Sequence, residues 1–139
     1  MLFGLLGVGI GAAETLSNDI VISSVPTAKA GAASAVSETA YEFGAVLGTT
    51  LLGGLLTATY RGSLQVPYGV DQEHVDLAME TLGGAVQSAK DLGGSAGEAL
   101  LEAAQHAFDQ GATVMSGAGA TLVFAAVVIA LVTLRKTKA

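Results

Sequence analysis

The feature that most constrains this chain is an uncharged apolar run near its C-terminal end. No charged residue occurs from Gln110 to Leu134, and the run contains the aliphatic stretch LVFAAVVIALVTL. At about 1.5 Å of rise per residue, a helix of this length crosses the roughly 30 Å hydrocarbon core of a bilayer. The run therefore predicts a transmembrane helix over residues 112–134 and argues against a soluble helical domain rich in Ala and Gly.

Two short basic segments orient the chain in a membrane. Residues 135–139, RKTKA, are basic, and basic residues beside a span favour the cytoplasm. Residues 26–30 contain Pro26, which disfavours continuation of a helix, and Lys29, the only base among the first 60 residues. We therefore expect a multi-pass protein of the plasma membrane with a short cytoplasmic loop at 26–30 and a cytoplasmic C-terminal tail.

Two further apolar runs predict two more spans. Residues 31–60 are uncharged from Phe43 onward and carry Glu38 and Glu42 in their first half. Residues 1–25 are also largely apolar. A signal peptide is the alternative for this run, since LFGLLGVGIGAA is a short apolar segment ending in small residues, but no basic segment precedes it. Because the chain begins almost directly with this run, we expect that it is cut from a longer protein.

Acidic residues are concentrated between the second and third predicted spans. Residues 61–111 contain eight acidic residues against two basic ones, which accounts for the whole net charge of −6. Apolar residues recur at helical spacing over 71–89 and over 95–108, and two glycines separate these segments. We therefore expect an all-α membrane protein of about three transmembrane helices, with a long extracellular loop that contains a helical hairpin between the second and third.

The chain shows no pattern typical of an enzyme, a cofactor site or a nucleic-acid-binding protein. It has no cysteine, no basic patch, and no arrangement of nucleophile, base and orienting acid. The GVGIG run follows no predicted strand and lacks the spacing of a nucleotide-binding loop. His74 and His106 lie far apart in the sequence without neighbouring metal ligands. We expect no catalytic residue, no metal and no cofactor.

Glu38 and Glu42 are the strongest candidates for a functional site. Their spacing of four residues places them on one helix face, one turn apart. Ionised carboxylates within a membrane are costly, so such a pair favours holding a proton or a cation. The alternative is that both are simply hydrated near the cytoplasmic end of the span, within about two to three turns of Lys29. Tyr41, which adjoins the pair, could offer an aromatic surface to an organic cation.

A second polar group, Glu14, Asn18 and Asp19, lies in the first predicted span. Glu14 and Asn18 share a helix face, whereas Asp19 is five residues from Glu14 and points about 140° away from it. We therefore expect that the three do not face one cavity equally. Glu14 is the deeper residue and the better candidate, while Asp19 fits a solubilising or capping role equally well.

Two motifs begin the second predicted span: Pro-x-x-x-Ala-Gly-x-Ala-Ser from Pro26 and Tyr-Glu-Phe-Gly-x-x-x-Gly from Tyr41. Together they resemble the start of the penultimate helix in fourteen-span drug:proton antiporters of the major facilitator superfamily, especially the branch that exports quaternary-ammonium and other organic cations. The preceding stretch, GVGIGAAETLSNDIVISSVP, also resembles the helix before it in that family, so the resemblance covers most of the chain.

The resemblance implies that the three spans correspond to spans twelve, thirteen and fourteen of such an antiporter. It implies that Glu38 and Glu42 exchange protons for lipophilic organic cations. It also implies that this chain assembles in the lipid membrane with the missing upstream spans. Three spans cannot form the two halves of a transporter, so we expect no transport by the isolated chain. The alternative is a small structural or accessory membrane protein that packs against a partner and uses its acids only to hold helices together.

Overall fold

The structure, a computed structural model, describes residues 2–137, and every regular element in this range is helical. The elements are α1 (Leu2–Ser23), the 3₁₀ turn η1 (Thr27–Lys29), α2 (Ala30–Ser63), α3 (Gln72–Glu80), α4 (Leu82–Leu92) and α5 (Gly94–Thr137). Met1 and the last two residues of the predicted tail, Lys138 and Ala139, lie outside the described residues. The chain divides into two compact units, Met1–Gly48 and Thr49–Ala139.

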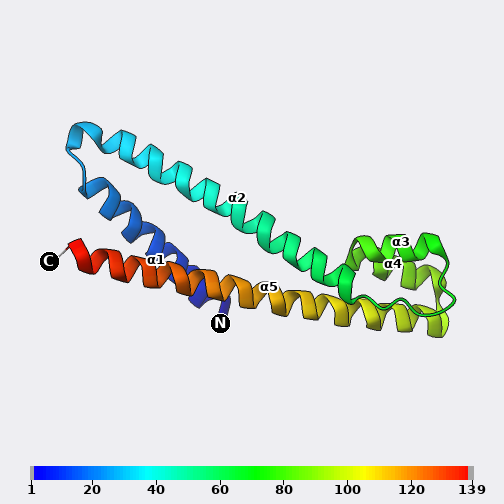
Figure 1. The fold of residues 1–139 in the computed structure, drawn as a ribbon. Coiled ribbons are helices and arrows are strands. Elements are labelled where there is room, and N and C mark those ends of the chain that lie inside the picture. The colour runs from blue at the N-terminus through cyan, green and yellow to red at the C-terminus, as the bar shows by residue number, and fades with distance from the viewer. Residues whose placement is uncertain (1, 138–139) are drawn as a thin grey trace. The chain divides into compact units, whose positions relative to one another are not determined.

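In the first unit, a short turn joins α1 to the beginning of α2 (Figure 1). α1 ends where the hydroxyls of Ser23 and Ser24 donate to the carbonyl oxygen of Ile20. Pro26 then stops the helix, because proline has no N–H to donate and disfavours helical backbone in the residue before it. The helix break therefore falls where Pro26 predicted it, and α2 begins directly after η1.

The second unit contains a compact cap, which we define as α3, α4 and residues 94–110 of α5. α3 packs against α4, and α4 packs against the first part of α5 (Figure 1). Small side chains dominate the core of the cap and let the helices approach closely. The buried apolar residues are Tyr60 from α2, Leu64 from the loop that follows, and Ala78, Ala85, Ala89, Leu100, Ala104 and Ala107.

Glycines permit the close packing and the turn within the cap. A Cβ atom on Gly84 would overlap the carbonyl of Leu77 on α3, so α3 and α4 can meet here only because Gly84 has no side chain. Gly93 and Gly94 form the turn between α4 and α5 with φ values of 61° and 54°, which side chains other than glycine rarely adopt. The separator predicted at these two glycines is therefore the turn between α4 and α5.

The cap differs from the predicted hairpin in two respects. The expected first arm, residues 71–89, is two helices, because Thr81 has an extended backbone and its hydroxyl oxygen accepts from the N–H of Gly84 at 3.0 Å. Threonine is a favoured N-cap, and this local signal overrides the apolar periodicity. The expected second arm, residues 95–108, is the beginning of α5, which runs unbroken because no proline interrupts it. No helix break separates the expected loop from the expected third span.

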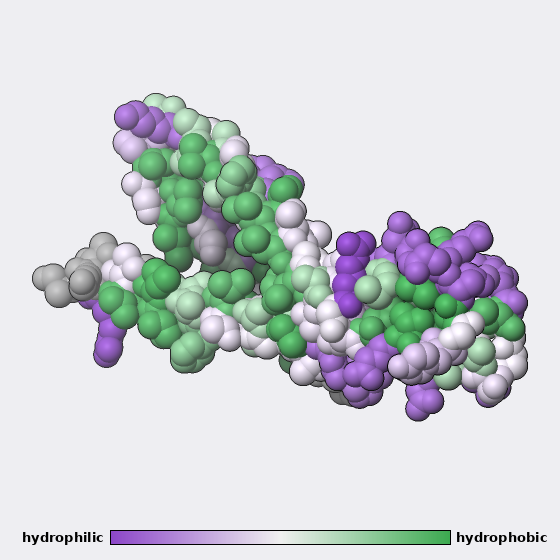
Figure 2. Space-filling view, turned by 45° about the vertical axis from the view of Figure 1, so that its right-hand side comes forward, coloured by the Kyte–Doolittle hydropathy of each residue, from purple (hydrophilic) through white to green (hydrophobic). Residues whose placement is uncertain are grey.

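Three helices are long and apolar enough to cross a membrane, which confirms the predicted fold class. They are Phe3–Ser23, Thr27–Ser63 and Gly94–Thr133. Of the residues in the apolar stretch of each helix, 0%, 6% and 0% respectively are buried. On the face shown in Figure 2, hydrophobic surface follows the long helices and hydrophilic surface covers much of α3 and α4. Exposed apolar surface of this extent is stable only against lipid or further helices. Where each helix enters the membrane stays a prediction.

Candidate functional site

A groove in the first unit gathers most of the polar residues singled out from the sequence. It lies between α1 and the beginning of α2 and has a cavity volume of about 940 Å³. Sites that bind small organic molecules commonly have about 300–1,000 Å³. The lining includes the carboxylates of Glu14 and Asp19 and the amide of Asn18 from α1. From α2 it includes the carboxylate of Glu38, the phenol of Tyr41 and the hydroxyl of Ser37.

Asp19 borders the same groove as Glu14 and Asn18, although the helical angle predicted that the three would not face one cavity equally. The reason is that α1 and α2 diverge from the turn that joins them (Figure 1). Helices that diverge leave side chains on their flanks uncovered, so residues from more than one flank of α1 line the groove.

The two glutamates of α2 differ in their placement. Glu38 lines the groove, whereas Glu42, one turn further from the connection to α1, does not. Both side chains are exposed. The structure thus brings Glu38 together with Glu14 and Asp19 on the other helix, a grouping across helices that sequence spacing does not reveal.

The groove carries negative charge without a positive partner. Within residues 2–137, the structure records no ion pair to Glu14, Asp19 or Glu38, and no lysine or arginine lines the groove. Carboxylates in this setting can take up protons or accept hydrogen bonds and charge from a cation. Tyr41 is 51% exposed and adds a ring of the kind that attracts cations.

The hydroxyl residues that line the groove, Thr15, Ser17 and Ser37, were not predicted from the sequence. Hydroxyl side chains in helices often bond to their own backbone, so their presence carries little functional signal. Thr15 does so, donating to the carbonyl oxygen of Gly11 at 2.8 Å. The spacing of four residues between Ser37 and Tyr41 is the one signal that could have placed Ser37 on the lining face.

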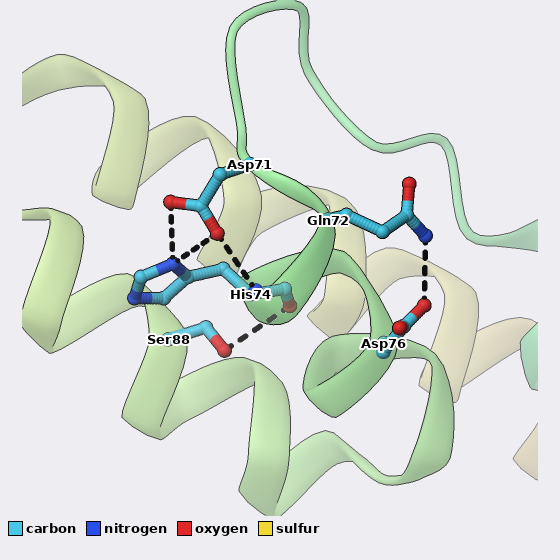
Figure 3. Close-up of polar contacts among 5 residues, drawn as sticks. All are labelled: Asp71, Gln72, His74, Asp76 and Ser88. Carbon is cyan, nitrogen blue, oxygen red and sulfur yellow. Dashed lines mark hydrogen bonds and ion pairs between the residues drawn. The ribbon is translucent and has the colours of Figure 1, made fainter.

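A second polar cluster lies in the cap, at the beginning of α3 (Figure 3). One carboxylate oxygen of Asp71 accepts from the backbone N–H of His74 at 3.1 Å, and both oxygens lie within 2.8 Å of Nδ1 of the His74 ring. The hydroxyl of buried Ser88, on α4, donates to the carbonyl oxygen of His74 at 3.2 Å. The cluster therefore caps α3 and joins it to α4.

These contacts change the protonation of both groups. The hydrogen bonds from the backbone and ring of His74 lower the pKa of Asp71. The hydrogen bond to Asp71, with smaller contributions from the charges of Asp91 and Glu73, raises the pKa of His74. Asp71 is exposed to water and the His74 side chain is partly exposed, so water screens the pair and the cluster has a structural role of modest strength.

The structure does not group the residues of a metal site. Nε2 of Gln110 lies 3.3 Å from Nδ1 of His106 on α5, one turn apart on the same helix. In the part of the chain that the structure describes, no three His, Cys, Asp or Glu side chains are placed to share a metal ion. The groove is therefore the candidate site that collects the most of the chemistry singled out from the sequence.

Comparison with known proteins gives relatives among curated sequences, while no family model and no solved structure matches the chain. The chain is 46% identical over 134 residues to the multidrug efflux pump LfrA of Mycolicibacterium smegmatis, covering 96% of the chain and 27% of the relative. It is 37% identical over 127 residues to the methyl viologen resistance protein SmvA of Salmonella typhimurium, covering 91% of the chain and 26% of the relative. The chain thus spans about a quarter of the length of these relatives.

Proposed function

We propose that this chain belongs to the multidrug efflux transporters that its motifs resemble, the drug:proton antiporters of the major facilitator superfamily, and that it forms the last three spans of such a transporter. The similarity over 96% of the chain to an efflux pump carries this proposal. In the whole transporter, the chain would take part in exporting organic cations in exchange for protons. It would act with the remaining spans, because alternating access requires two helical halves.

We propose that η1 and the C-terminal end of α5 face the cytoplasm and that the cap faces outward. Lys29 follows α1, and Arg135 stands in the last turn of α5, where basic residues favour the cytoplasmic side. Two spans separated by the cap bring these two basic segments to the same side. The acidic cap then lies in water on the other side.

We propose that Glu38 exchanges a proton for the cationic cargo and that Glu42 is a second exchanging carboxylate on the same helix. Glu14, Asn18, Asp19 and Tyr41 would be further contacts of the cargo. An ionised carboxylate in a membrane site is costly, so the group favours either a proton or a cation beside it. Uptake of a proton would then accompany release of the cargo, which is the exchange that an antiporter needs.

The exposure of the groove supports this assignment. Glu14, Asp19 and Glu38 lie on helices proposed to cross the membrane, where ionised carboxylates facing lipid would be costly. We therefore infer that the groove faces further spans or a water-filled cavity in the whole transporter. Methyl viologen, which appears in the name of one relative, is an organic dication and suits a groove lined by acids.

Charge-removing substitutions in the intact transporter test the proposal. Glu38→Gln should lower proton-driven efflux of methyl viologen by about tenfold or more, because loss of one charge partner changes binding by at least about 1.4 kcal/mol. Glu42→Gln should lower it less, because Glu42 does not line the groove. The measurement is efflux from proteoliposomes under an imposed pH gradient.

Glu80→Gln is the matched control, because Glu80 is an exposed acid at the end of α3, in the cap. This variant should transport like the wild type. Wild-type efflux by both the Glu38→Gln and the Glu42→Gln variants would contradict the proposed role of these carboxylates in proton exchange. It would favour the alternative in which these acids only hold helices together.

A further inference from the structure

Two side chains, Tyr60 and Arg61, fasten the last turns of α2 to the cap. Tyr60, only 3% exposed, donates its hydroxyl hydrogen to the carbonyl oxygen of Ala78 at 2.7 Å. Nε of Arg61 donates to the carbonyl oxygen of Met79 at 3.1 Å. Both carbonyls belong to the last turn of α3, where backbone acceptors have no partner within their own helix. We call Tyr60 and Arg61 the clamp.

The clamp holds the cap at the point where the chain changes direction. α3 ends at Glu80, and Thr81 caps α4, so the carbonyls bound by the clamp lie directly before the turn between α3 and α4. The guanidinium of Arg61 also places positive charge at the C-terminal end of α3, where the helix dipole favours it. Loss of the clamp would therefore free the end of α3, and with it the beginning of α4, from α2.

α5 approaches α2 beside the clamp. Gly111 is buried, and a Cβ atom on it would lie 2.8 Å from Cδ1 of Leu56, 3.0 Å from the Leu56 carbonyl oxygen and 3.6 Å from the backbone nitrogen of Tyr60. A Cβ so near a backbone carbonyl is strained, so glycine permits this approach. The short stretch 56–61 of α2 thus contacts α5 on one side and holds α3 on another.

We propose that Tyr60 and Arg61 are positioning residues for transport, which make the cap follow the end of the span that carries Glu38 and Glu42. This inference rests on the proposed function. α2 is an uninterrupted helix from Ala30 to Ser63, so a tilt of this span during alternating access would move the turn to which the cap is fastened. A cap that is not fastened would not follow the span.

Tyr60→Phe in the intact transporter tests the clamp, because it removes the hydroxyl and keeps the ring. Loss of one buried hydrogen bond, about 1 kcal/mol, should speed amide hydrogen exchange in α3 and α4 about fivefold. The maximal rate of methyl viologen efflux per binding site should fall, while the apparent affinity stays unchanged because the groove is not altered. Tyr68→Phe is the control, since Tyr68 is fully exposed in the loop between α2 and α3.

Arg61 provides a second test that does not depend on a buried residue. Arg61→Gln should act in the same direction as Tyr60→Phe, because Arg61 is exposed and its loss leaves the core of the cap intact. Arg61→Lys keeps the charge and a donor and should recover part of the maximal rate.

Two results would overturn the inference. Unchanged exchange in α3 and α4 in both the Tyr60→Phe and Arg61→Gln variants would mean that the clamp does not hold the cap. Faster exchange with wild-type maximal rates would mean that the clamp is structural only. A wild-type transporter that moves no organic cation would defeat the proposed function instead, and the transport role of the clamp with it, while the exchange data would still report whether the clamp exists.

Discussion

At the scale of single residues, carboxylate side chains have different roles according to their neighbours. Asp71 is exposed, yet its carboxylate accepts from the backbone and lies beside the ring of His74, so its bonding capacity is used within the cap. Glu14 and Glu38 make no ion pair within residues 2–137 and stand in candidate spans. A carboxylate of the first kind stabilises a helix, whereas one of the second kind is available to a ligand.

The Asp71–His74 pair makes the cap sensitive to pH. The pKa of His74 is raised in the folded cap, so its stabilising contribution is complete below the unfolded pKa and is lost as the pH rises through the folded value. The pKa of Asp71 is lowered, so its contribution is present above the unfolded pKa and is lost as the pH falls through the folded value. Amide exchange in the first turn of α3, corrected for intrinsic rates, should be slowest between the two unfolded pKa values.

His74→Gln separates the two contributions. In this variant the corrected amide exchange rate should no longer rise as the pH increases from its minimum. It should still rise as the pH falls, because Asp71 still accepts from the backbone N–H of residue 74. The effect should be small, since Asp71 is exposed and water screens its interaction with His74. If amide exchange at higher pH were the same in this variant as in the wild type, the ring of His74 would not contribute to the stability of the cap.

At the scale of elements, the cap depends on how closely helix backbones approach. Its buried residues are mostly alanines, which bury little apolar area, so steric fit between helices matters more than large side chains. The periodicity of apolar residues predicted helix over this region but not its division into α3 and α4. That division comes from the N-cap at Thr81 and the close contact at Gly84, and only the second requires knowledge of the neighbouring helix.

Gly84 and Gly83 are a matched pair for testing this fit, because they are adjacent residues of α4. Gly84→Ala should destabilise the cap by about 1–3 kcal/mol, since the new methyl group meets the Leu77 carbonyl. Gly83→Ala meets only the Thr81 hydroxyl oxygen, at 3.7 Å, and should be neutral or stabilising by up to about 1 kcal/mol. Unfolding of the cap in the intact protein, followed by hydrogen exchange, measures both. Equal effects would contradict the close approach.

At the scale of the whole molecule, the chain presents more apolar and acidic surface than three helices can cover themselves. We predict that the chain alone, reconstituted in liposomes, gives no proton-driven efflux of methyl viologen, because alternating access requires two halves. The intact transporter in the same vesicles is the control and should transport. Efflux by the chain alone would contradict the need for further spans.

The helical class, the three candidate spans and the resemblance to efflux transporters were accessible from the sequence alone, because apolar length, charge placement and short motifs are properties of contiguous residues. The position of Glu38, Glu42, Glu14 and Asp19 in predicted spans was accessible for the same reason. Their assignment as an exchange site remains a proposal.

Only the tertiary structure decided which of these residues meet. It placed Asp19 and Glu38 along one groove and left Glu42 outside it, and it set Tyr60 against the carbonyl of Ala78. Such groupings depend on which helix faces approach each other and on where a missing side chain, as at Gly111, allows close contact. Those distances join residues far apart in the chain, and no spacing within a single helix encodes them.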